Sequence, residues 1–153
     1  MPSLQEIYAK FGDAAEAAQL LETQIGNLLL TTAVEAHGLA EARNKALARK
    51  ILEEVDRKTL GQLVKALKKV HPSAGQLEET LALALAERNR LNHSFYRQHN
   101  FRRNTEEGRL AMFADLDVIH GRLLDAYQKV LFLSGIDITN VTMLRPPIKH
   151  VPI

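Results

Sequence analysis

Four helix-start signals, spread from the third residue to the last third of the chain, constrain this sequence more than any other feature. In the capping-box pattern a Ser or Thr precedes a helix, and a Glu or Gln three residues later bonds back to it. Asn can also serve as the cap. The signals are Ser3 with Glu6, Thr59 with Gln62, Ser73 with Gln76, and Asn104 with Glu107. They predict four main helices.

Apolar residues recur at helical spacing after these signals, and no stretch alternates with period two for long enough to predict a strand. We expect helices at about 4–37, 59–70, 73–99 and 105–133, and residues 41–56 also have helical composition. Gly38 is the expected stop of the first helix. The predicted inward stripe of the first helix is Leu4, Ile7, Phe11, Ala14, Ala18, Leu21, Ile25 and Leu28. That of the last helix is Leu110, Phe113, Leu116, Ile119, Leu123, Ala126 and Val130.

Long helices joined by short connections predict an all-α fold, an antiparallel four-helix bundle with one or two additional short helices. The chain has 153 residues, the size of one domain that can bury a core without disulfides or metals. We expect this bundle to occupy residues 1–136. Residues 137–153 contain three prolines and little periodicity, so we expect an extended C-terminal tail.

Composition excludes several classes of site. The chain has no cysteine, which removes disulfides, thiolate zinc sites and cysteine nucleophiles. Residues 1–10 lack the basic-then-apolar pattern of a secretion signal, and no apolar run approaches the ~20 residues that span a bilayer. We therefore expect a cytoplasmic protein that does not enter a membrane.

The positive charge is concentrated in the middle of the chain, although the net charge is only +2. Residues 1–40 carry one Lys against five acids, whereas residues 41–70 carry nine Lys and Arg against four acids. Residues 88–109 carry six Arg against Glu106 and Glu107. For 41–70 we expect solvated helix faces.

Arg88 interrupts the apolar stripe of the third main helix. The stripe otherwise consists of Leu77, Leu81, Ala84, Leu91 and Phe95. An unpaired guanidinium is very costly to bury. Arg88 must therefore extend to solvent, pair with an acid of the first helix such as Glu16 or Glu22, or belong to a functional site.

Arg88, Asn89 and His93 form the pattern Arg-Asn-x-x-x-His. Asn89 and His93 share a helix face, whereas Arg88 and His93 lie ~140° apart around the helix and ~7.5 Å apart along it. The pattern resembles the signature of HEPN domains, helical bundles of similar size, many of which are metal-independent ribonucleases. Such proteins often act as toxins or in defence against phage.

The resemblance implies that Arg88, Asn89 and His93 are catalytic, that no cofactor or metal is needed, and that two copies of the motif meet across a homodimer cleft. It also implies RNA as the substrate and allows an antitoxin or other regulatory protein as a partner. The chemistry of the side chains agrees. Histidine titrates near neutrality and suits proton transfer, and arginine offers a planar fork of donors to phosphate. Asn89 would orient the imidazole or bind the phosphate.

Residues 94–103 follow the motif and combine three aromatics with three arginines, a composition typical of surfaces that bind phosphates and stack bases. The candidate RNA-binding residues are Arg90, Tyr96, Arg97, His99, Arg102 and Arg103. The competing interpretation is that Phe95 and Phe101 are core residues and the arginines are merely solvated. For Phe95 we favour the core, because it continues the stripe.

Two other interpretations remain open. His93, His99, His120 and Asp117 are of ligand type, but their spacing matches no zinc motif, and we expect His120 at the edge of the core. The alternative to an enzyme is a non-catalytic dimeric helical module that binds a protein or a nucleotide, in which Arg88 and His93 are structural. An open cleft around these two side chains favours the enzyme, and a sealed one favours the module.

Overall fold

The computed structural model describes residues 1–38 and 45–135, and within them every regular element is helical. The predicted all-α fold is confirmed. The elements are α1 (Leu4–Ala36), α3 (Lys45–Asp56), α4 (Leu60–Val70), η1 (Pro72–Leu77), α5 (Glu78–His93), α6 (Phe95–His99), η2 (Asn100–Asn104) and α7 (Glu106–Leu133), where η denotes a 3₁₀ helix. The expected tail, 137–153, lies outside the described residues. No helix in the described part is long and apolar enough to cross a membrane.

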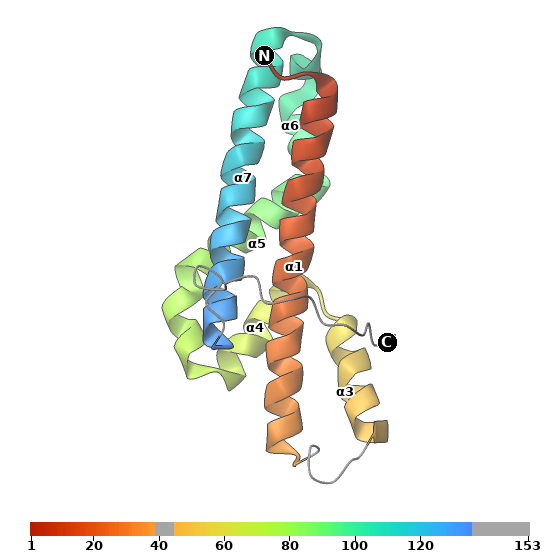
Figure 1. The fold of residues 1–153 in the computed structure, drawn as a ribbon, viewed down its shortest axis with the longest axis vertical. Helices are drawn as coiled ribbons and strands as arrows, with labels where there is room; N and C mark the ends of the chain where they lie inside the picture. The colour runs from red at the N-terminus through yellow and green to blue at the C-terminus, as the bar shows by residue number, and fades with distance from the viewer. Residues whose placement is uncertain (39–44, 136–153) are drawn as a thin grey trace, which may run out of the picture.

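The two long helices, α1 and α7, lie side by side and run in the same direction (Figure 1). Lys10 pairs with Asp117, and Gln24 bonds Ser134 further along both helices, which fixes a parallel alignment. This corrects the expected antiparallel arrangement for that pair. Between these two helices, α3 runs back beside the lower part of α1, and α5 and α6 lead the chain up to the start of α7 (Figure 1).

The core lies between α1, α4, α5 and α7. On α7 the predicted positions Leu116, Ile119, Leu123, Ala126 and Val130 are fully buried. Leu110 was also expected inside, but it is 51% exposed, and Met112 is buried instead. The predicted stripe of α1 is buried from Ile7 to Leu28, apart from Phe11, which packs against the core while remaining partly exposed.

Two of the predicted caps form and two do not. Ser3 and Thr59 make complete capping boxes. Ser73 does not begin α5, because Pro72 starts a 3₁₀ turn there and the helix follows only after Leu77. The last helix is capped by Thr105, whose Oγ1 accepts from the N–H of Gly108 at 3.0 Å, and not by Asn104.

The helix predicted over 73–99 is divided at Ser94. The Ser94 hydroxyl donates to the carbonyl of Arg90 at 3.2 Å, a local bond that competes with helical geometry. The chain then forms α6 and turns at Asn100, which adopts a positive φ of 37°. This break places α6 and η2 at the N-terminal end of α7 (Figure 1).

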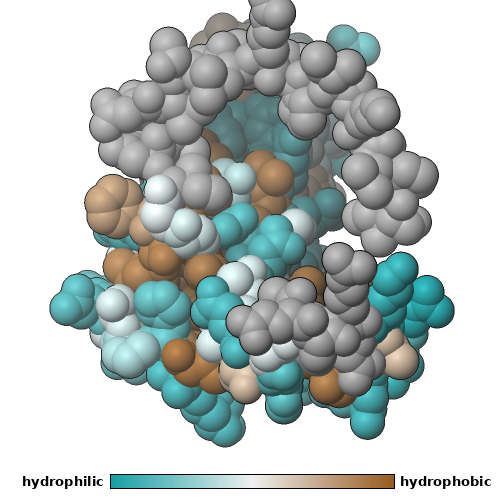
Figure 2. Space-filling model, turned by 60° about the horizontal axis from the view of Figure 1, so that its bottom comes forward, coloured by the Kyte–Doolittle hydropathy of each residue, from teal (hydrophilic) through white to brown (hydrophobic). Residues whose placement is uncertain are grey.

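The opposite end of the molecule carries a mixed surface. Val70 and Phe132 are 46% and 68% exposed. In Figure 2 apolar side chains there alternate with hydrophilic ones.

Candidate functional site

Arg88 is held by one ion pair and one amide. Its Nε donates to Oε1 of Glu22 on α1 at 3.0 Å, and its Nη1 donates to Oδ1 of Asn89 at 3.2 Å. The side chain is 22% exposed. Among the alternatives for Arg88, pairing with an acid of the first helix is the one found. Within the described residues Nη2 has no bond, so one edge of the guanidinium remains available.

Asn89 and His93 are both exposed on the same face of α5. The Asn89 amide oxygen accepts from Arg88, so Asn89 orients the arginine rather than the imidazole. No side chain in the described part of the chain bonds the His93 ring. The three motif residues are thus accessible to a ligand and not sealed in the core.

Arg90 occupies a different environment from Arg88. Its two terminal nitrogens donate to both oxygens of Asp115 on α7, at 2.6 and 2.7 Å, and its Nε donates to Glu87 at 2.9 Å. The hydrogen bonds to Asp115 raise the pKa of Arg90, and the same bonds lower the pKa of the Asp115 carboxyl. Arg90 was a candidate RNA contact, but its donors are committed to carboxylates.

Glu87, which the sequence analysis did not single out, is the buried charge of α5. It is 5% exposed and also accepts from Nη1 of Arg122. It follows Ala84 by three residues and precedes Leu91 by four, so it lies on the apolar stripe as fully as Arg88 does. That spacing in the sequence could have identified Glu87 as a candidate buried residue.

His99 is buried between an acid and an arginine. Its Nε2 lies 2.7 Å from Oδ2 of Asp115, and Nη1 of Arg102 lies 3.2 Å from its Nδ1. A guanidinium can only donate, so Nδ1 must accept and the ring proton must be on Nε2. The ring is 5% exposed and packs 4.6 Å from Phe95. His99 therefore positions Arg102 and does not face a ligand.

The remaining candidates form an exposed group around α6 and η2. Tyr96 is 39% exposed and stacks on Phe11 at 5.2 Å; burial raises the pKa of its hydroxyl. Arg97 is exposed and donates to the carbonyl of His93 at 3.3 Å. Arg102 and Arg103 are exposed on η2. We call Arg97, Arg102 and Arg103 the arginine group.

Phe95 and His120 lie where the sequence indicated. Phe95 is 1% exposed in the core. His120 is partly buried at the edge of the core, and its Nδ1 lies 3.4 Å from Nζ of Lys10. In the described part of the chain no three His, Cys, Asp or Glu side chains converge closely enough to hold a metal ion.

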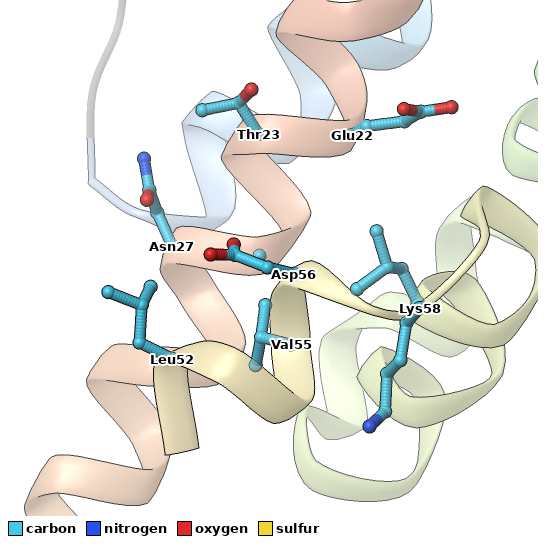
Figure 3. Close-up of a pocket in the computed structure, with 9 residues that line it drawn as sticks. Glu22, Thr23, Asn27, Leu52, Val55, Asp56 and Lys58 are labelled. Atoms are coloured by element: carbon cyan, nitrogen blue, oxygen red, sulfur yellow. The ribbon is translucent and has the colours of Figure 1, made fainter. Parts of the chain in front are cut away.

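A hollow of about 210 Å³ opens beside Glu22, between α1, α3 and the start of α4. Asn27 and Asp56 project toward it, while the Lys58 amine points away (Figure 3) and donates to the Glu54 carbonyl. Glu22 therefore lines this hollow and also forms the ion pair with Arg88.

Compared with protein families, curated proteins and solved structures, the chain matches none. Membership of the HEPN family therefore stays a prediction that rests on the Arg88–Asn89–His93 pattern.

Proposed function

We propose that this protein is a metal-independent endoribonuclease of HEPN type, acting in the cytoplasm as a toxin or a phage-defence effector. One observation carries the proposal. Where α5 packs on α1, the partly exposed Arg88 keeps a free guanidinium edge while its other donors are fixed by Glu22 and Asn89, and the exposed His93 imidazole further along α5 has no bond to any described side chain. A positioned cation and a free proton carrier are the two groups that metal-independent phosphodiester cleavage requires.

The proposed reaction forms no covalent bond between the RNA and the protein. The ribose 2′-oxygen attacks phosphorus, the bond from phosphorus to the 5′-oxygen breaks, and a 2′,3′-cyclic phosphate and a 5′-hydroxyl form. His93 takes the 2′-hydroxyl proton or delivers a proton to the leaving oxygen. Arg88 stabilises the charge on the phosphorane through its free edge.

A homodimer would complete the proposed site. One His93 cannot be both the base and the acid of a single step, and Arg88 and His93 are ~140° apart around α5. A second copy of the motif, facing the first, would supply the other proton carrier.

The test is an RNA cleavage assay with purified protein in EDTA. We expect cyclic-phosphate ends, and a loss of rate of about 10²- to 10⁴-fold in His93→Ala. His37→Ala is the matched control, because His37 is also exposed but lies at the far end of α1. An unchanged rate in His93→Ala would overturn the proposal.

The Arg88–Glu22 ion pair favours a second candidate, a non-catalytic dimeric module that binds a protein or a nucleotide. In that case Arg88 serves α5–α1 packing alone. The module predicts no cleavage by the wild-type protein, together with a lower melting temperature for Arg88→Ala.

A further inference from the structure

Phe101 is the most exposed large apolar side chain in the described part of the chain, at 75%. It lies in η2, the turn that joins α6 to α7. This excludes the core interpretation of Phe101. A large aromatic face exposed on an ordered turn is available to stack on a ligand.

The turn is fixed by contacts of the two residues that follow Phe101. Gly108 lets η2 close onto α7, since a Cβ there would lie 2.0 Å from the Arg102 carbonyl oxygen. Arg109 donates to the carbonyl of Arg103 at 3.3 Å and to that of Pro2 at 2.9 Å. The exposure of Phe101 is therefore a property of the fold.

Phe101 lies beside two cations in the sequence. Arg102 and Arg103 follow it directly, and the guanidinium of Arg103 has no hydrogen bond to any described residue. Glu106 and Glu107 are in the first turn of α7, where the helix dipole stabilises acids. Tyr96, 39% exposed, is a second ring in the same group. Exposed rings beside arginines match a ligand that is both planar and anionic.

We propose that Phe101 stacks on an unpaired nucleobase of RNA while the arginine group binds the adjoining phosphates, so that the ligand is single-stranded or looped RNA. Stacking on an aromatic ring accepts every base, whereas duplex bases are not available to it. This inference rests on the proposed function for the identity of the ligand, but it concerns binding and not cleavage.

The test uses the absence of tryptophan from the chain. In Phe101→Trp the single indole reports stacking, and we expect its fluorescence to be quenched by a single-stranded oligonucleotide but not by the duplex of the same sequence. Phe132→Trp is the matched control. Phe132 is 68% exposed but lies near the other end of α7, about 40 Å away by helical rise, and should not be quenched.

Affinity is measured with the same oligonucleotide in the His93→Ala background, so that cleavage cannot intervene. Phe101→Ala should weaken binding roughly 5- to 100-fold, and Phe101→Tyr should retain most of it. Circular dichroism checks that each variant keeps its helices. Equal affinity of Phe101→Ala and its parent overturns the inference, as does a change in oligomeric state without a change in affinity.

The two proposals fail in different ways. If quenching and the affinity loss occur but the wild-type protein cuts no RNA, the ribonuclease proposal fails and the stacking role stands. If the wild-type protein cuts RNA and Phe101→Ala binds it equally well, the stacking role fails alone.

Discussion

Arg88 and Glu22 form an ion pair that joins α5 to α1, with 3.0 Å between Nε and Oε1. The pair fixes the inner edge of the guanidinium and leaves Nη2 without a partner in the described residues. It therefore stabilises the packing of two helices and also orients the side chain that we propose for phosphate binding.

Arg88→Lys separates these two roles. Lysine keeps the charge but lacks the planar fork, so it can pair with Glu22 or face a phosphate, but not both through one rigid group. We expect RNA cleavage to fall at least about tenfold, while the melting temperature changes by only a few degrees. The measurements are the cleavage rate and a thermal melt. A Lys variant that cuts RNA at the wild-type rate would contradict the role of the fork.

Helix ends and apolar stripes could be predicted from the sequence. The features that depend on contacts between residues far apart in the chain could not. The ends of α1 follow from Ser3 and from Gly38, whose φ is 61°, and both signals act within one turn. Periodicity also identified the stripe of α5. It could not tell which of the two adjacent charged residues, Glu87 or Arg88, is buried. Glu87 is buried because of partners on α7: Arg122 pairs with it directly, and Asp115 acts through Arg90. The parallel alignment of α1 and α7 is likewise a tertiary outcome.

Glu87 should contribute strongly to stability. It is buried and accepts from both Arg90 and Arg122, so Glu87→Ala leaves a cavity and removes the acceptor of two guanidinium groups. We expect a loss of about 2–4 kcal/mol in the free energy of unfolding, measured by urea denaturation. Glu79→Ala, at an exposed position of the same helix, should change stability by less than about 0.5 kcal/mol. Equal stabilities of the two variants would rule out this role.

Asp115 should make the protein sensitive to acid. Hydrogen bonds from Arg90, and secondarily from His99, lower the pKa of its carboxyl below the ordinary 3.8. The stabilisation is therefore present above the unfolded pKa and is lost as the pH falls through the lower, folded value. We expect the melting temperature to decrease once the pH falls below about 4. Asp115→Asn should melt at a lower temperature near pH 7 and show a shallower decline in acid.

Gly108 and Gly121, both on α7, provide a matched pair for the turn that carries Phe101. Alanine is the better helix former, so Gly121→Ala should stabilise by about 0.5–1 kcal/mol, because nothing lies within 4 Å of its added Cβ. At Gly108 the Cβ would lie 2.0 Å from the backbone oxygen of Arg102, a contact that only displacement of η2 can relieve. Gly108→Ala should therefore destabilise by about 1–3 kcal/mol despite the same gain in propensity. Thermal melts of both variants test this, and a Gly108→Ala protein as stable as Gly121→Ala would show that η2 does not rest on α7.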